Sequence, residues 1–136
     1  MNADAAQMNV MQERKRLNGL SEKVIGAAQM VSRVLGHGFL EKVYENALCI
    51  ELTQREVLFT QQMPLEVRYR GMIVGDYVPD LVVERCLILE IKATPSVSAI
   101  HRQQCLNYLR TSDLRLGLVL NFGRAHLEVG RVVNHF

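Results

Sequence analysis

The stretch that most constrains this chain is residues 78–93, where charged residues interrupt two apolar runs. It reads Val-Pro-Asp-Leu-Val-Val-Glu-Arg-Cys-Leu-Ile-Leu-Glu-Ile-Lys-Ala. The runs of Val, Ile and Leu around the polar break at Glu84 and Arg85 predict two antiparallel strands joined by a tight turn. Because side chains alternate along a strand, Glu90 and Lys92 point to the same face. Charges in an otherwise apolar sheet have to be paired or bound to a metal.

The register of this hairpin decides whether Asp80 lies beside Glu90. If the loop holds only Glu84 and Arg85, Asp80 faces away from Glu90; if Cys86 joins the loop, the two carboxylates lie directly opposite each other. The Cβ atoms of such a pair are about 4.5 to 5.5 Å apart. Two carboxylates at that distance repel each other unless a cation lies between them. We therefore predict the three-residue loop, and carboxylates on opposite faces would contradict it.

Length and composition predict one domain and exclude several classes of protein. The chain has 136 residues, which suffice for one core and not for two ordinary domains. A net charge of +2 gives no global basic field for coating nucleic acid. No segment is as long as a membrane span, so no membrane partner is expected. We expect a disordered or loosely ordered tail over 1–18 and a single domain over 19–136.

Cysteine usage favours a reducing compartment. Cys49, Cys86 and Cys105 are odd in number, widely spaced and set in apolar runs. This spacing fits neither a disulfide framework nor a zinc site. Buried free thiols in the cytoplasm are therefore the prediction.

Apolar periodicity predicts an α/β sandwich. Helical and alternating patterns indicate helices over 21–35, 40–56 and 98–110 and strands over 65–69, 72–83, 87–93, 116–122 and 126–133. Ser21 is the expected N-cap of the first helix, and the second strand is expected to break near Gly75. The strand, helix and buried strand over 87–122 predict a right-handed parallel βαβ unit.

A second polar group lies on the predicted helix over 98–110. His101, Gln104 and Tyr108 fall at i, i+3 and i+7, on one face. Gln104 and Tyr108 are suited to hydrogen-bond a phosphate or a metal-bound water. The alternative is that Tyr108 is a core aromatic, that Gln104 is solvated and that His101 is a surface group.

The acidic residues can also be explained by purely structural roles. Glu41 lies in the first turn of the second helix, where the helix dipole by itself favours a carboxylate. Asp80, Glu90 and Lys92 fit a structural ion-pair cluster about as well as a metal site when the strand pattern is taken alone. The residues by themselves leave this choice open.

Five short motifs in a fixed order resemble a known family. They are Gly38-Phe-Leu-Glu41-Lys-Val-Tyr44, Pro79-Asp80, Glu90-Ile-Lys92-Ala, Gln104 with Tyr108, and Gly117-Leu-Val-Leu-Asn121-Phe122-Gly123. Over residues 20–134 the chain resembles the GxxExxY proteins of the PD-(D/E)XK nuclease superfamily, with His37 where that family usually has Pro. The resemblance implies an α-β-β-β-α-β core, in which helices flank a mixed central sheet. It also implies the RecB-like branch, which pairs an acid on the first core helix with a Gln-x-x-x-Tyr helix.

The chemistry permitted by these residues is metal-assisted hydrolysis of phosphodiester bonds. Hard oxygen ligands suit Mg²⁺ or Mn²⁺. The expected metal ligands are Asp80, Glu90, the carbonyl of Ile91 and Glu41. Lys92 is expected to orient the attacking water and to offset negative charge in the transition state. Gln104 and Tyr108 are expected to position water or phosphate.

The expected partner is nucleic acid, with DNA ahead of RNA. Homodimerisation is a further hypothesis, since a domain of this size leaves little surface for substrate. The alternative function is a catalytically silent module with the nuclease fold that binds nucleic acid or protein.

Overall fold

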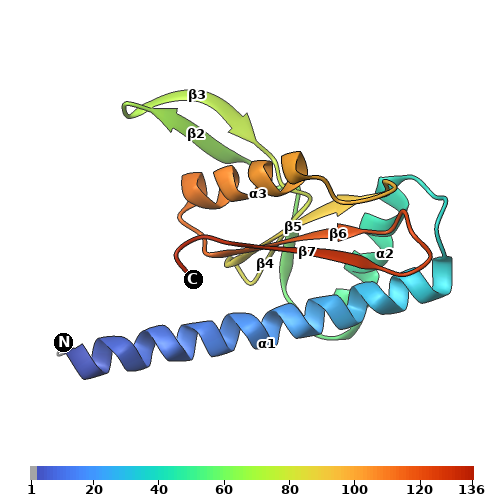
Figure 1. Cartoon of the computed structure of the whole chain (residues 1–136), viewed down its shortest axis with the longest axis horizontal. Helices are drawn as coiled ribbons and strands as arrows, with labels where there is room; N and C mark the ends of the chain where they lie inside the picture. Colours follow the sequence, from blue (N-terminus) through green and yellow to red (C-terminus); the bar gives the residue numbers. More distant parts are fainter. Residues whose placement is uncertain (1–2) are drawn as a thin grey trace.

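The computed structural model describes residues 3–136, which form a mixed sheet flanked by helices (Figure 1). The helices are α1 (Ala3–Leu35), α2 (Glu41–Gln54) and α3 (Ala99–Ser112). The strands are β1 (Phe59–Gln61), β2 (Leu65–Tyr69), β3 (Met72–Tyr77), β4 (Leu81–Val83), β5 (Leu87–Lys92), β6 (Leu116–Asn121) and β7 (Glu128–Val133). The predicted class, a mixed α+β fold with helices around a mixed sheet, is confirmed.

The central sheet has the strand order β1-β4-β5-β6-β7. Strands β5 and β6 are parallel, and the other neighbouring pairs are antiparallel. Helix α3 connects the two parallel strands, so the predicted βαβ unit is confirmed. Strand β7 lies at an edge of this sheet, as predicted for residues 126–133.

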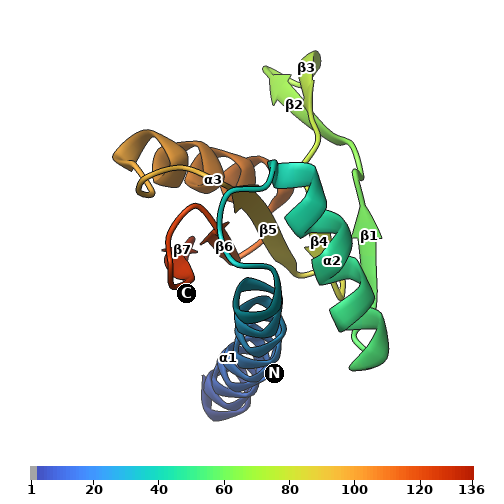
Figure 2. The same ribbon diagram turned by 90° about the vertical axis from the view of Figure 1, so that its right-hand side faces the viewer.

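Two helical layers cover opposite faces of the sheet, with α1 and α2 on one side and α3 on the other (Figure 2). Alternation along β5 assigns its side chains to these layers. Leu89 and Ile91 belong to the core beneath α1 and α2, whereas Ile88 packs with the residues of α3. Glu90 and Lys92, which share the face of Ile88, are therefore directed to the α3 side.

The strand expected over 72–83 is divided in the structure. Strand β3 pairs with β2 in a separate two-stranded sheet, and this hairpin projects away from the central sheet (Figures 1 and 2). Pro79, which has no N–H donor, lies between β3 and β4. Strand β1, which pairs with β4, was not predicted. With three residues, this strand is too short to show an alternating pattern of apolar and polar residues.

The first helix begins at Ala3, so the prediction of an N-cap at Ser21 is wrong. The expected tail is helical from Ala3 onward, and its first two residues lie outside the described part of the chain. No proline interrupts this segment, which is rich in helix-forming Ala, Gln, Met and Arg. Leu17 is only 2% exposed, and the Arg14 side chain donates to the carbonyl of Phe136.

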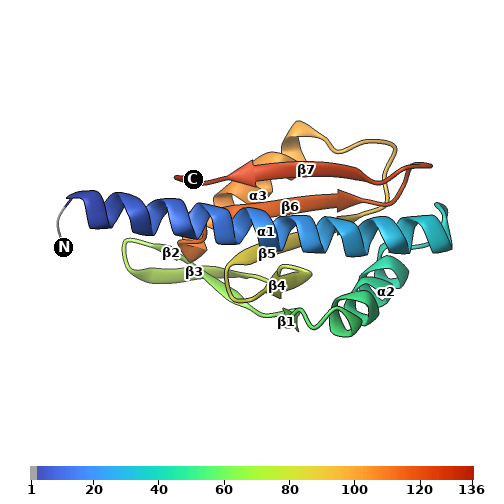
Figure 3. The same cartoon turned by 90° about the horizontal axis from the view of Figure 1, so that it is seen from below.

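Helix α1 runs along the whole length of the sheet (Figure 3). Among residues 3–136, no helix combines the length and the hydropathy needed to cross a lipid bilayer.

Candidate active site

The β4–β5 hairpin has the predicted register. Leu81 pairs with Leu89 and Val83 with Leu87, so one further step places Asp80 opposite Glu90. The loop consists of the three residues 84–86, closed by a 3.0 Å hydrogen bond from the N–H of Cys86 to the carbonyl of Val83. Its first two residues are left-handed, with φ of 52° and 59°. Glu84 and Arg85 therefore adopt a backbone conformation that usually favours glycine, although the loop contains no glycine.

Asp80 is fixed by the strand across from it. Its Oδ2 atom accepts a 2.7 Å hydrogen bond from the N–H of Ile91. The N–H and C=O of one strand residue point to the same side, so the carbonyl of Ile91 also faces Asp80. Burial raises the pKa of the Asp80 carboxyl, and the hydrogen bond from Ile91 opposes that rise. Asp80 and the Ile91 carbonyl thus offer oxygen atoms on the same side of β5.

Glu90 carries the least satisfied carboxylate of the proposed site. Its Oε1 atom is buried and has no hydrogen-bond partner within residues 3–136. Burial raises the pKa of Glu90 to about 7, with Lys92 opposing this shift and the charges of Glu41 and Glu45 adding to it. A buried oxygen without a partner is unfavourable unless a proton or a cation compensates it.

A small cavity of about 100 Å³ lies between β5 and α3. It is lined by Tyr77, Glu90, Lys92, His101, Gln104, Cys105 and Tyr108. Four predicted site residues, Glu90, Lys92, Gln104 and Tyr108, therefore meet in one place. His101, expected to be a surface group, is half-buried and lines the same cavity. Gln104 is exposed although it lines the cavity, and the α3 residues buried against the sheet are Cys105 and Leu109. The face predicted from i, i+3 and i+7 spacing therefore lies at the edge of the contact between α3 and the sheet.

Glu41 lies apart from this cavity. It is the first residue of α2 and is exposed, although its charge acts on Glu90. Within the described chain, no three or more His, Cys, Asp or Glu side chains are grouped closely enough to hold a metal ion. Glu41, Asp80 and Glu90 therefore do not form the three-carboxylate cluster that was expected.

The remaining donor set still fits a hard divalent cation. The hairpin register carries Asp80 and Glu90 on facing backbone positions, the Ile91 N–H binds Asp80 on the side to which its own carbonyl points, and the Oε1 atom of Glu90 lacks a partner in the described chain. Oxygen donors of this kind are the ligands that Mg²⁺ and Mn²⁺ prefer.

A buried carboxylate missed in the sequence lies next to this site. Glu45 is 3% exposed and accepts hydrogen bonds from Lys42 Nζ at 2.9 Å and from Gln61 Nε2 at 2.6 Å. Gln62 Nε2 donates to the same carboxylate at 3.2 Å. Burial alone would raise the pKa of Glu45, but these hydrogen bonds outweigh it, so the pKa is lowered. The i, i+4 spacing from Glu41 on α2 was the available signal.

Glu45 and Gln62 also act on Asp80. The Glu45 charge raises the pKa of the Asp80 carboxyl, whereas the Gln62 side chain lowers it. The backbone N–H of Gln62 donates to the carbonyl of Asp80 at 3.1 Å. The connection between β1 and β2 therefore helps to hold Asp80 in place.

Tyr44, the tyrosine of the first motif, has a structural role. It is completely buried and stacks on Phe122, with ring centroids 4.7 Å apart. Its hydroxyl donates to the carbonyl of Gly36 at 2.7 Å and accepts from the N–H of Phe39 at 3.1 Å. Tyr44 thereby fixes the loop from which α2, with Glu41 at its start, begins.

Comparison with known proteins identifies the superfamily of the chain. A family model described as the PD-(D/E)XK nuclease superfamily matches residues 18–132. No curated protein and no solved structure matches the chain. The matched residues include the β4–β5 hairpin, the cavity and α3, and their mixed sheet flanked by helices is consistent with the nuclease fold. The chain therefore belongs to the PD-(D/E)XK nuclease superfamily.

Proposed function

We propose that this protein is a divalent-metal-dependent nuclease of the GxxExxY family, in the RecB-like branch, that hydrolyses phosphodiester bonds. The observation that carries the proposal is the Oε1 atom of Glu90, which is buried without a partner in residues 3–136. The hairpin register places the backbone of a second acidic residue, Asp80, across from that of Glu90. A divalent cation bound between them would activate water and stabilise charge on the phosphate.

The chain's own groups have separate roles in this proposal. Asp80, Glu90 and the Ile91 carbonyl would hold Mg²⁺ or Mn²⁺, and Glu41 would add negative charge near the ion from the start of α2. Lys92 lies two residues after Glu90 on the same face of β5, so its ammonium group orients the attacking water and offsets transition-state charge.

Gln104 and Tyr108 form the opposite wall of the cavity from α3. Their amide and hydroxyl groups position water or a phosphate oxygen. The substrate class that we propose is nucleic acid, with DNA ahead of RNA. The three free cysteines fit a reducing compartment, and we infer a cytoplasmic location.

Homodimerisation is a separate hypothesis, supported by apolar side chains at the far end of the β2–β3 hairpin. Tyr69 and Met72 are 64% and 73% exposed there. Sedimentation analysis of wild type and Met72→Asp would test it, because a dimer formed through this end would dissociate in the variant.

The nuclease proposal is tested by two substitutions with matched controls. Asp80→Asn removes one charge but keeps an oxygen that accepts from Ile91, and Lys92→Ala removes the ammonium group. Each is expected to lower Mn²⁺-dependent cleavage by roughly 100-fold or more, as loss of a transition-state contact does. Asp76→Asn and Lys23→Ala, at exposed positions, should cleave like wild type. Linear, circular and single-stranded DNA and RNA form the substrate panel.

Calorimetric titration with Mn²⁺ separates the two classes of function. If the protein is a nuclease, wild type should bind Mn²⁺ and cleave nucleic acid. Asp80→Asn should lose both Mn²⁺ binding and cleavage. Binding of metal and nucleic acid without turnover on any substrate would instead identify a catalytically silent module. Equal cleavage by wild type, Asp80→Asn and Lys92→Ala would exclude this site.

A further inference from the structure

The cavity between β5 and α3 is lined mainly by hydrogen-bond donors. Lys92, His101, Gln104 and two tyrosines face it, whereas Glu90 is the acidic side chain in its wall. Its volume of about 100 Å³ is suited to a phosphate-sized group. It is too small to hold a phosphate and a nucleobase together. Two of these donors, His101 and Tyr77, have no role in the proposed metal chemistry.

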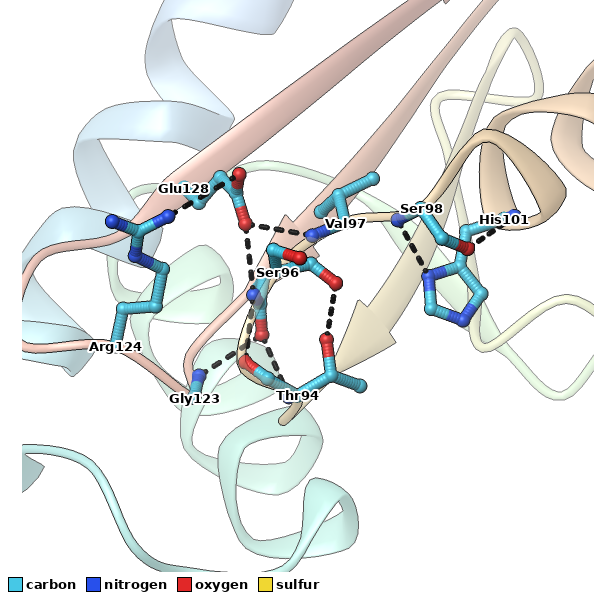
Figure 4. A network of polar contacts seen from close by, with 9 residues as sticks. Thr94, Ser96, Val97, Ser98, His101, Gly123, Arg124 and Glu128 are labelled. Carbon is cyan, nitrogen blue, oxygen red and sulfur yellow. Dashed lines mark hydrogen bonds and ion pairs between the residues drawn. The ribbon is translucent and has the colours of Figure 1, made fainter.

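The tautomer of His101 follows from its own helix cap. The backbone N–H of Ser98 donates to Nδ1 of His101 at 3.2 Å, and the backbone N–H of His101 donates to Oγ of Ser98 at 3.2 Å (Figure 4). Since Nδ1 accepts a hydrogen bond, the proton of the neutral ring is on Nε2. Figure 4 shows Nε2 on the side of the ring away from the Ser98 N–H. His101 therefore presents an N–H donor as its second polar group.

The loop that carries this cap is held by the end of β6. The buried side chain of Asn121 binds both the N–H and the carbonyl of Thr94, each at 3.0 Å. Glu128 Oε1 accepts from Asn121 Nδ2 at 2.9 Å and from the N–H of Val97 at 2.8 Å (Figure 4). Residues 94–97 are thereby fixed immediately before Ser98. His101 is thus held in place before any ligand arrives.

Tyr77 supplies an independent indication of a ligand. Its hydroxyl oxygen is buried and lacks a hydrogen-bond partner within the described residues 3–136. Its ring stacks on Tyr108, with the planes only 5° apart, so β3 brings the hydroxyl to the wall of the cavity. A buried hydroxyl without a partner is costly, and a ligand acceptor in the cavity would remove that cost.

We propose that Tyr77 and His101 are substrate-binding residues that, together with Lys92, hold one phosphate group of a nucleic-acid strand in this cavity. The hydroxyl of Tyr77 and the Nε2–H of His101 donate to non-bridging phosphate oxygens, and the ammonium group of Lys92 balances their charge. The identity of the ligand as a strand phosphate rests on the proposed nuclease function. The hairpin that carries Tyr77 thereby becomes part of the substrate site.

Two substitutions remove these donors without removing their structural contacts. Tyr77→Phe keeps the ring that stacks on Tyr108. His101→Asn keeps an oxygen near the position of Nδ1, where it can accept from Ser98, but lacks the Nε2 donor. Tyr69→Phe and His126→Asn are matched controls at exposed positions. Glu90→Gln removes the acidic charge from the cavity wall and should strengthen phosphate binding.

The experiment measures binding of inorganic phosphate and of a 5′-phosphorylated oligothymidylate to metal-free protein by calorimetric titration, and nitrogen-15 NMR of the histidine rings follows His101 in wild type and in Tyr77→Phe. Both ligands should shift the His101 Nε2 resonance, and each should bind roughly tenfold more weakly to Tyr77→Phe and to His101→Asn than to wild type. The two control variants should bind as wild type does.

Unchanged affinity in both variants would overturn the proposal, even if wild type cleaves nucleic acid. Binding of inorganic phosphate without binding of the oligonucleotide would also overturn it, because the cavity would then exclude a strand. If phosphate and oligonucleotide bind as expected but no substrate is cleaved with Mn²⁺, the nuclease proposal fails and the phosphate site stands.

Discussion

Glu90 is in electrostatic conflict when no cation is bound. Burial and the neighbouring acids disfavour its charge, while Lys92 favours it, and the net effect raises the pKa of Glu90 to about 7. A group whose pKa is higher in the folded state binds more protons there than in the unfolded chain. The stability of the metal-free protein should therefore fall as pH rises from the unfolded value of about 4.3 to about 7.

Glu90→Gln tests this conflict. In the absence of metal, the free energy of unfolding of the variant should match that of wild type near pH 4 and exceed it above pH 7 by up to about 4 kcal/mol, because the rise of the Glu90 pKa to about 7 is worth about 1.4 kcal/mol per pKa unit. The measurement is urea unfolding in EDTA at several pH values. Glu22→Gln, at an exposed position, is the control and should follow the wild-type curve. A Glu90→Gln variant that is less stable than wild type at pH 8 would contradict the assignment.

At the scale of elements, the β4–β5 hairpin was predicted correctly because its information is local. The alternation of Leu87 to Lys92 sets the face, and the number of loop residues sets the register. Helix α3 lies close to the predicted range of 98–110. Strand β1 and the separation of β3 from β4 depend instead on long-range pairing. The hydrogen bond from Gln62 to Glu45 depends on how α2 packs against the end of β1. A local sequence pattern does not contain that information.

The junction between β5 and β6 is packed without space for a side chain. A Cβ atom on Gly123 would overlap the backbone nitrogen and oxygen of Thr94. Gly123→Ala should therefore force these backbones apart and cost about 1 to 3 kcal/mol of unfolding free energy, the usual range for overpacking. Chemical denaturation measures this change.

Gly19→Ala is the matched control for that substitution. Gly19 lies inside α1, and a Cβ atom there would meet nothing within 4 Å. Alanine has the higher helix propensity, so this variant should gain roughly 0.5 to 1 kcal/mol. A loss of stability of similar size in both variants would show that the close approach at Gly123 is not the cause.

At the scale of the whole molecule, the proposed site draws on both helical layers and on two sheets. The proposed metal ligands come from the β4–β5 hairpin, the cavity wall from β5, α3 and β3, and the neighbouring carboxylate Glu45 from α2. The sequence predicts the helices one by one. It does not show that α2, α3 and β3 come together near the end of β5, because that depends on the three-dimensional fold. The fold class was therefore easier to predict than the position of Glu45 beside the site.

Helix α1 begins well before residue 19, where the sequence predicts that the domain starts. Leu17 lies before that boundary and is 2% exposed in the main core, whereas Met11, on the same helix, is 66% exposed. Leu17→Ala should cost about 2 to 5 kcal/mol in urea unfolding, as buried leucines do, and Met11→Ala should change stability by less than about 0.5 kcal/mol. Equal stabilities of these two variants and wild type would mean that the residues before 19 are a tail after all. A selective loss in Leu17→Ala would instead make the first half of α1 part of the domain that holds the site.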